Sequence, residues 1–392
     1  MAQGFDVVVI GGAAIGSAVA YFLSAQPGFK GRVLVLERDP RYTECATTRS
    51  LASIRHQFSN ALNIRMSLFG TRFLRQAHEH LAVDGDAPAL GFREGGYLFL
   101  ASPSGLSVLQ TNHLLQRAEG ADVALLEPAA LAARFPWLRT HDIAGGSLGQ
   151  SGEGWFDPHA LLHGFRRKAL AQGVTYRAGQ VVALRNQGRR ASEVIMVDGS
   201  RVHADWFVNA AGTGAAALAR SAGIDLPVQS RKRCVFHFRS PAPLPGCPLV
   251  IDPTGLYFRP EGAGFLCGIA PAEHEDPECF DFSVPADWFE ERLWPALAHR
   301  VPGFEAARLM SAWAGHYDVN LLDANAILGP HPDVDNLLFA NGFSGHGLQQ
   351  SPAVGRALSE WIVHGGYRSL DLSALGWERV IQQRPLRELN VV

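Results

Sequence analysis

The chain has 392 residues, enough for two or three domains, and its 47% hydrophobic and 18% charged residues are typical of a folded, non-membrane protein. Thirty-five basic side chains against 37 acidic ones leave a net charge of -2, so the chain lacks the basic footprint expected of a nucleic-acid-binding protein. The five cysteines show no C-x-x-C spacing, which argues against a disulfide framework, a zinc site or a dithiol redox centre. From this cysteine pattern we expect reduced thiols. No apolar run reaches about 18 residues, so we expect a cytoplasmic location and at most peripheral membrane contact.

Residues 5–39 carry the strongest pattern. Residues 5–10 form a β-branched run typical of a buried parallel strand, a glycine turn and a helical pattern at 17–25 follow, and a second β-branched run at 32–36 ends at Glu37. In a dinucleotide-binding unit the glycines let the pyrophosphate approach the backbone, the helix N-terminus faces the phosphates, and the acidic residue accepts a hydrogen bond from a ribose hydroxyl. The pattern predicts a bound dinucleotide; the alternative is a βαβ unit that binds nothing.

Ala13 stands where the second glycine of this motif is usual, and its methyl group should push the phosphates slightly outward without abolishing binding. Hydroxyl groups in the polar loop at residues 41–55 could supplement the pyrophosphate site. The contacts predicted in this region are Gly11, Gly12, Ala13, Ala14, Ile15, Gly16, Glu37, Arg38, Thr47 and Thr48.

Two later turns also lead from a strand into a helix. Residues 204–212 are an apolar strand followed by a glycine turn and a helix at 215–222, and residues 336–340 are a strand followed by a glycine-rich loop and a helix at 351–363 begun by Pro352. Such turns bring backbone amides close to a ligand, although tight packing without a ligand is the alternative for the first. The contacts predicted here are Ala211, Gly212, Gly342, Phe343, Ser344, Gly345, His346, Gly347, Leu348 and Gln349, with Val182 from a strand at 180–184.

The middle of the chain has a different pattern of predicted secondary structure. Residues 233–239, 249–252, 256–259 and 264–269 are short alternating strands separated by turn residues, which predicts an antiparallel sheet in a second domain. We expect a short helix at residues 131–137. We expect residues 366–392 to form an exposed tail.

Taken together, these motifs resemble the D-amino-acid-oxidase-like family of flavoproteins, which includes sarcosine and glycine oxidases and D-amino-acid dehydrogenases. Residues 55–59, 95–102 and 342–352 are most similar to the branch called FAD-dependent oxidoreductase domain-containing protein 1, whose eukaryotic member is associated with assembly of respiratory complex I. The family resemblance rests on residues 9–16 with Glu37-Arg38, Asp157-Pro158, residues 208–212, residues 313–315 and residues 342–347.

The resemblance implies an α/β fold of the glutathione-reductase type, with a Rossmann-like FAD-binding domain and an antiparallel-sheet substrate domain. It implies FAD, with its ADP half on the opening unit and its isoalloxazine between the domains, bordered by residues 342–350. Amides there and the following helix N-terminus would stabilise negative charge on the reduced ring. The implied domains are residues 1–90, 151–225 and 316–392 for FAD and residues 91–150 and 226–315 for the substrate.

Three departures from the sarcosine-oxidase branch refine this expectation. Residues 313–317 lack the cysteine that carries covalent flavin there, which implies noncovalent FAD. Leu266 replaces a lysine that favours reaction with oxygen, which implies a dehydrogenase. Gln349 replaces a lysine that binds the substrate carboxylate, so a different cation must hold any carboxylate.

Flavin-dependent amine oxidation depends mainly on positioning the substrate, and a fixed cation is the chief requirement. Arg55 matches a carboxylate-binding arginine of the sarcosine-oxidase branch, with a surface or phosphate-binding arginine as the alternative. Arg259 is the second candidate, with a salt bridge on the solvent face of the sheet as its alternative. Tyr257 could cover the substrate or be an ordinary sheet tyrosine.

His316, Tyr317 and His346 are the plausible proton-active groups, although each histidine could equally be a packing residue. His78, His80 and His331 lack a third ligand at sensible spacing, so we expect no metal.

The resemblance therefore implies an FAD-dependent oxidoreductase that acts on a small amine or amino acid, either N-methylated, secondary or of D configuration. The reaction is hydride transfer to flavin N5, and electrons pass to an unidentified acceptor, which favours a dehydrogenase. Two alternatives remain open: an oxidase with the same half-reaction, and an FAD-stabilised assembly or interaction protein with little catalysis.

Overall fold

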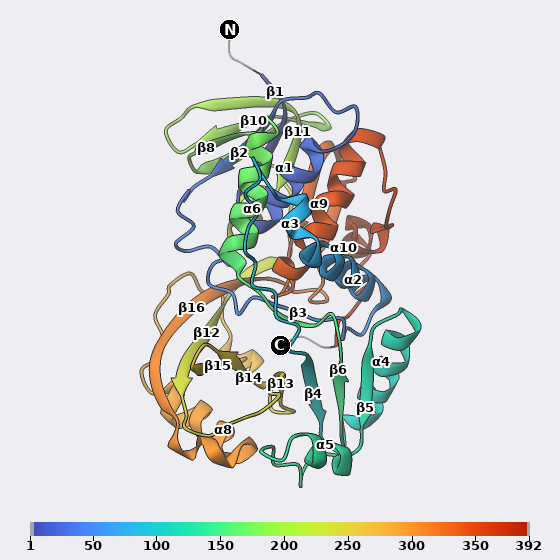
Figure 1. Cartoon of the computed structure of the whole chain (residues 1–392). Helices are drawn as coiled ribbons and strands as arrows, with labels where there is room; N and C mark the ends of the chain where they lie inside the picture. The colour runs from blue at the N-terminus through green and yellow to red at the C-terminus, as the bar shows by residue number, and fades with distance from the viewer. Residues whose placement is uncertain (1–3, 390–392) are drawn as a thin grey trace.

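The first of two large β-sheets is built around β1 (Phe5–Ile10), whose central valines are fully buried. The computed structural model describes residues 4–389 (Figure 1). Strand β1 pairs in parallel with a strand on each side, as its apolar sequence predicts. The strand order is β17 (Ile327–His331), β18 (Val334–Asn341), β11 (Arg201–Asn209), β1, β2 (Val33–Glu37) and β8 (Thr175–Ala178), and β10 (Arg190–Met196) and β9 (Val181–Gln187) extend β11 in antiparallel fashion.

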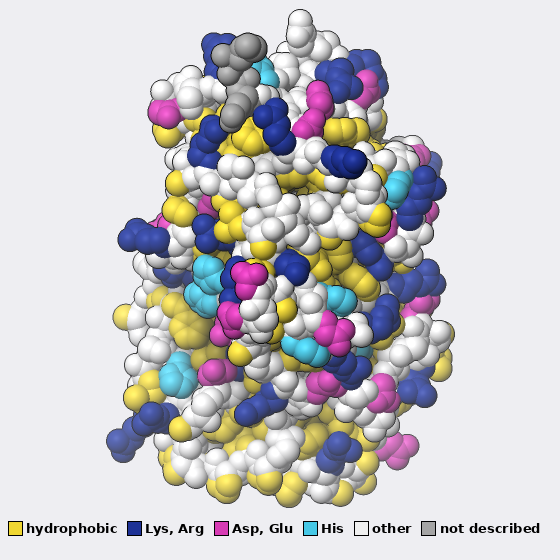
Figure 2. Space-filling model, turned by 45° about the horizontal axis from the view of Figure 1, so that its top comes forward, with side chains coloured by type: hydrophobic (Ala, Val, Ile, Leu, Met, Phe, Trp, Pro, Cys, Tyr) yellow, Lys and Arg dark blue, Asp and Glu magenta, His cyan; other side chains and the backbone are white. Residues whose placement is uncertain are grey.

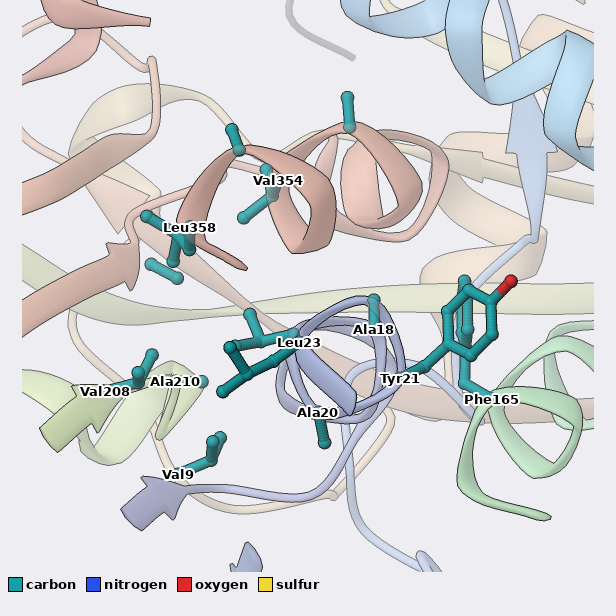
Figure 3. Packing of buried hydrophobic residues seen from close by; sticks show 14 of the residues in the cluster. Val9, Ala18, Ala20, Tyr21, Leu23, Phe165, Val208, Ala210, Val354 and Leu358 are labelled. Carbon is teal, nitrogen blue, oxygen red and sulfur yellow. The ribbon is translucent and has the colours of Figure 1, made fainter. Parts of the chain in front are cut away.

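Helices α1 (Ala14–Ser24), α6 (Pro158–Ala171) and α9 (Gly347–His364) cover one face of this sheet, with α2 (Ala61–Arg75) next to α9 (Figure 1). Helices α1 and α9 approach closely because Gly355 has no side chain: a Cβ there would lie 2.7 Å from the carbonyl of Ala18. Figure 3 shows Leu23 of α1 between the sheet and α9. This packing fixes both helix N-termini at the same edge of the sheet.

The opposite face of the sheet is covered by α7 (Ala215–Ser221) and α10 (Trp377–Ile381). The ring of Trp377 packs edge-on against Phe339 of β18 at 4.9 Å between centroids. The prediction of an exposed tail from residue 366 onward is therefore wrong for the described residues, because Leu372, Leu375 and Trp377 bury their side chains in the core.

The second sheet lies below the first in Figure 1, and α8 (Trp294–Arg300) packs on its outer face. Neighbouring strands are antiparallel except β13 and β4, which are parallel. The α/β fold with a second, mainly antiparallel sheet is thus confirmed, whereas the domain limits stay a prediction. The strand order is β16 (Arg308–Asn320), β12 (Val228–Arg239), β15 (Gly264–Ile269), β14 (Leu256–Glu261), β13 (Leu249–Ile251), β4 (Tyr97–Ala101), β6 (Gly145–Gly149) and β5 (Val123–Leu126).

Two helix boundaries differ from the predictions. The helix expected at residues 131–137 is α5 (Pro128–Arg134), because Pro128 suits a first helical position. The helix expected from residue 351 begins at Gly347, so Pro352 lies inside it. The hydroxyl of Ser351 donates to the carbonyl of Leu348 at 2.8 Å, which satisfies the acceptor that proline cannot serve.

The remaining elements are the 13-residue helix α4 and several short helices and strands. A small ribbon pairs β3 with β7, and α3 follows α2 after a break. Their bounds are β3 (Ser53–Ile54), β7 (Gly154–Trp155), α3 (Ala77–His80), α4 (Leu106–Ala118), a π-helix at Phe289–Leu293 and 3-10 helices at Gly212–Gly214, Glu273–Glu275, Pro302–Ala306 and Ser373–Leu375.

Charged side chains of both signs are interspersed on the face shown in Figure 2, in keeping with the near-zero net charge. Within residues 4–389, the helices are too short or too polar to cross a bilayer.

Candidate functional site

A cleft lies where β1, β2, β11 and β18 end, at the carboxyl edge of the parallel strands. This edge is where open α/β sheets bind ligands. Fifteen of the predicted site residues line the cleft: Gly11, Ala13, Ala14, Ile15, Glu37, Arg38, Thr47, Val182, Ala211, Gly212, His316, Phe343, Gly345, Gly347 and Leu348. Residues from three distant parts of the chain therefore meet in one cavity.

The first glycine turn has the close packing that its sequence predicts. Gly11 has a φ of +97°, and a Cβ on Gly16 would approach the carbonyl oxygen of Gly11 well inside 3.0 Å. Ala13 is the N-cap of α1 and, as an alanine, has no side-chain acceptor for the first N–H groups of the helix. The N–H of Ala14 donates to Oγ1 of Thr47 at 3.3 Å, and the N-terminus of α1 borders the cleft, a position that suits an anionic ligand group.

Glu37 is held at the end of β2 by backbone amides. Its Oε2 accepts from the N–H of Gly12 at 2.7 Å and its Oε1 from the N–H of Asp39 at 2.9 Å. Each carboxylate oxygen can accept a further hydrogen bond, so Glu37 can serve a ribose hydroxyl at the cleft wall.

The loop between β18 and α9 forms the other end of the cleft. Gly345 has a φ of +93°, and a Cβ there would collide with the ring of Tyr317, which also lines the cleft. Asp318 holds this loop, because its Oδ2 accepts from the N–H of Gly342 at 2.8 Å; burial raises the pKa of Asp318 to about 6. The N-terminus of α9 begins directly after the loop. A glycine turn with an acidic residue at one end and a second amide-rich loop at the other fit the pyrophosphate, ribose and ring of FAD.

The other predicted cofactor contacts are not among the residues that line the cleft. Thr48 donates its hydroxyl hydrogen to the carbonyl of Tyr42 at 2.6 Å, and Ser344 accepts from the N–H of Asn320 at 3.1 Å. Gln349 accepts from the N–H of Arg55 at 3.0 Å and from the hydroxyl of Ser67 at 3.1 Å. The predicted residues outside the lining are Gly12, Gly16, Thr48, Gly342, Ser344, His346 and Gln349 with Arg55, Tyr257 and Arg259.

Arg55 is almost fully buried, at 2% exposure, beside the loop that ends the cleft. Its Nη2 lies 2.9 Å from Nε2 of His346, and its Nη1 donates to the carbonyl of Gln57 at 3.0 Å. A guanidinium only donates, so Nε2 of His346 accepts and Nδ1 carries the ring proton. Burial and the charge of Arg55 hold the pKa of His346 well below its usual range, so this histidine is neutral.

Aromatic rings and a buried carboxylate surround the guanidinium of Arg55. Its Cζ lies 4.4 Å from the ring centroid of Phe58 and 5.2 Å from that of Phe99 on β4. Glu153 accepts from the N–H of His56 at 2.6 Å and from Nε2 of Gln57 at 2.8 Å, and burial raises the pKa of Glu153 to about 7. The Arg55 guanidinium thus has apolar walls, and the acidic side chains of Glu388 and Glu153 act on its charge.

Arg259 and Tyr257 lie on β14, deeper in the second sheet. Arg259 donates from Nη2 to the carbonyl of Leu51 at 2.9 Å and forms an ion pair with Glu261. This ion pair matches the alternative interpretation of Arg259, although at 5% exposure the residue is not on a solvent face. Tyr257 is buried over Gly268, and burial raises the pKa of Tyr257 well above its usual value.

His316 faces the cleft from β16. Its Nε2 lies 2.9 Å from the carbonyl oxygen of Asp281, which only accepts, so Nε2 carries the ring proton. The ring packs edge-on against Phe282 at 4.5 Å between centroids, and burial lowers the pKa of His316. The roles of His316, His346, Arg55, Arg259 and Tyr257 stay predictions.

Three described side chains could share a metal ion: His141, Asp142 and His299, whose ligand atoms lie within 4.8 Å of one another. Both oxygens of Asp142 accept from Arg300 at 2.9 Å, and this positive charge opposes cation binding. These residues are absent from the cleft lining. The prediction of no metal stays a prediction.

Sequence reasoning missed Asp318 and Glu153 as members of the site. Asp318 follows the predicted His316 and Tyr317 on one strand, and recognising a strand there would have placed it against the loop it holds. Glu153 precedes the Gly154-Trp155 pair and offers no local signal, because its partners lie about a hundred residues earlier in the chain.

Comparisons with known proteins agree with this geometry. A family model described as FAD dependent oxidoreductase matches residues 6–361. FAD-dependent oxidoreductase domain-containing protein 1 of Xenopus laevis is 43% identical, over 99% of this chain and 85% of that protein. Mitochondrial dimethylglycine dehydrogenase of Rattus norvegicus is 27% identical, over 92% of this chain and 43% of that protein.

Solved structures give the same picture of the fold. L-proline dehydrogenase from P. horikoshii superposes with a TM-score of 0.85 at 23% identity and covers 97% of this chain and 99% of its own. Glycine oxidase from Geobacillus kaustophilus superposes with a TM-score of 0.81 at 24% identity and covers 95% of this chain and 98% of its own. At these identities the likeness shows the fold alone.

Proposed function

Because the chain belongs to the FAD dependent oxidoreductase family, whose members use FAD, we propose that it oxidises a small amine or amino acid that carries a carboxylate. The substrate class would be an N-methylated, secondary or D-amino acid. The product would be an imine, which water hydrolyses.

The observation that carries this proposal is the buried guanidinium of Arg55 next to the loop at the end of the cleft. A guanidinium surrounded by Phe58 and Phe99 interacts strongly with an incoming carboxylate, because little water screens the charges. A carboxylate held by Arg55 would place the rest of the substrate beside the loop that bears His346.

Bound FAD would supply the hydride acceptor for this oxidation. The chain's own residues then have three tasks: Arg55 binds the carboxylate, the aromatic rings of Tyr317 and Phe99 exclude water, and neutral His346 keeps the guanidinium in place. The substrate amine must be neutral for hydride loss.

We favour a dehydrogenase with noncovalent FAD over an oxidase. The support is Leu266, a buried apolar side chain where the related oxidases carry a lysine. The relatives and structural neighbours include proteins named dehydrogenases and proteins named oxidases, so they do not decide between the two.

The test is carboxylate binding, followed through the visible absorbance of the bound flavin. Propionate, which has no amine, is titrated into the wild type and into Arg55→Met, Arg259→Met and Arg41→Met, the last being a control with an exposed side chain. We expect Arg55→Met to weaken binding about tenfold to a hundredfold, in the range of hydrogen bonds to charged groups. Loss of binding in Arg259→Met alone would move the carboxylate to Arg259, and equal binding in all four proteins would remove the support for the proposal.

A further inference from the structure

The segment that follows α10 runs back to the start of α2 and reaches the loop that bears Arg55. Glu388, at 5% exposure, is the buried residue of this segment, whereas Arg387 beside it is exposed. The backbone of this segment is also held in place. The N–H of Leu386 donates to Asp323 at 2.9 Å, and Nε of Arg379 on α10 lies 2.8 Å from the same carboxylate. We call residues 384–389 the C-terminal strap.

The carboxylate of Glu388 gathers four donors from the N-terminus of α2. Its Oε1 accepts from the N–H and from the hydroxyl of Ser59, both at 2.8 Å. Its Oε2 accepts from Nδ2 of Asn60 at 2.9 Å and from Nδ2 of Asn63 at 3.0 Å. Residues 61–64 contain no acidic side chain, so Glu388 supplies from the far end of the chain the negative charge that a helix N-terminus favours.

The same residues connect the strap to the first turn of α9 and, through it, to Arg55. Asn63 accepts from Nε2 of Gln350 at 3.0 Å, and Gln350 lies in the first turn of α9, directly after the loop that closes the cleft. The neighbouring Gln349 accepts from the N–H of Arg55. The negative charge of Glu388 also offsets part of the burial effect that lowers the pKa of Arg55.

We propose that Glu388 is a positioning residue: it pins the C-terminal strap onto the start of α2 and thereby fixes residues 55–59, so that a substrate carboxylate meets a guanidinium already in place. The effect on substrate rests on the proposed function, whereas the effect on residues 55–63 does not. Loss of the Glu388 carboxylate would leave four hydrogen-bond donors without their acceptor. We therefore expect Glu388 to hold the loop at residues 55–59 firmly.

The test compares Glu388→Gln with Arg387→Gln, a matched control one residue away on the exposed side. Hydrogen exchange of the FAD-loaded proteins is measured without any substrate. We expect exchange in residues 57–66 to become at least tenfold faster in Glu388→Gln and to stay unchanged in Arg387→Gln, with bound FAD equal in both. Unchanged exchange in Glu388→Gln, or acceleration spread evenly over the whole chain, would overturn the proposal.

Propionate binding gives the second readout. We expect its dissociation constant to rise about tenfold in Glu388→Gln, and an unchanged constant alongside faster local exchange would overturn the link to Arg55. If the wild type binds no propionate, the proposed function loses its support while the exchange result still decides the role of the strap. Should Glu388→Gln fail to fold, Ser59→Ala removes one of the four donors and should give a smaller acceleration confined to the same residues.

Discussion

The buried carboxyl group of Glu153 should make the unfolding free energy of the protein depend on pH. The side chain is fully buried, and burial raises its pKa from 4.5 to about 7. A raised pKa means that the folded state holds the proton more tightly than the unfolded state. The stabilisation is therefore complete below pH 4.5, is lost as the pH rises toward 7, and stays lost above that value.

One pKa unit corresponds to about 1.4 kcal/mol, so the wild type should lose about 2 to 3 kcal/mol of unfolding free energy between pH 5 and pH 8.5 through this group. Glu153→Gln cannot titrate and should lack this loss. With an unfolding entropy of about 2.1 cal/mol/K per residue, the melting temperature of the wild type should fall about 3 °C further than that of the variant over the same interval.

The assay is thermal unfolding of both FAD-loaded proteins at pH 5 and pH 8.5, with FAD in equal excess. Glu94→Gln is the control: Arg75 holds the pKa of the exposed Glu94 below its usual value, so this group stays ionised across the interval. Its substitution should shift the melting temperature equally at both pH values. Parallel curves for the wild type and Glu153→Gln would refute the reasoning, because they would mean that Glu153 titrates alike in the folded and unfolded states.

Three substitutions test the cofactor site and the core. Gly16→Ala should reduce the FAD bound per chain, measured as the ratio of absorbance at about 450 and 280 nm, since the new methyl group meets the carbonyl of Gly11; full occupancy would contradict the packing described. Gly345→Ala should shift the flavin spectrum by displacing Tyr317, whereas Gly262→Ala, with a φ of +56° and open space around it, should not; equal spectra would contradict this. Phe304→Ala, in the core of the second sheet, should cost about 3 to 5 kcal/mol in thermal unfolding while leaving the spectrum of the folded protein unchanged.

The elements with strong local patterns could be predicted from the sequence. Strand β1 and the turn at Gly11 follow from a β-branched run and a glycine motif, and Figure 1 shows β1 within the first sheet. The long strand β16 was missed, because its first half is exposed and its alternation is weak over Arg308–Asn320.

Residues joined by distant contacts could not be predicted. Glu388 meets Ser59 across more than three hundred residues, and no periodicity in the sequence relates the two. Trp377 is buried because it packs on Phe339, so part of the segment predicted to be an exposed tail contributes to the core. Conversely, Gly11, Ala211 and Gly345 could be predicted to line the cleft. Each of them follows a strand, and the three strands end at the same edge of the sheet.

The most direct test of the account is the anaerobic absorbance of the bound flavin during titration with glycine, N-methylated glycines, proline and D-amino acids. We expect one of these classes to bleach the flavin, and we expect the colour to return slowly in air if the proposed dehydrogenase activity is correct. Return within seconds would identify an oxidase instead. Reduction by dithionite but by no amine of the panel would contradict the proposed catalysis and favour an FAD-stabilised assembly protein.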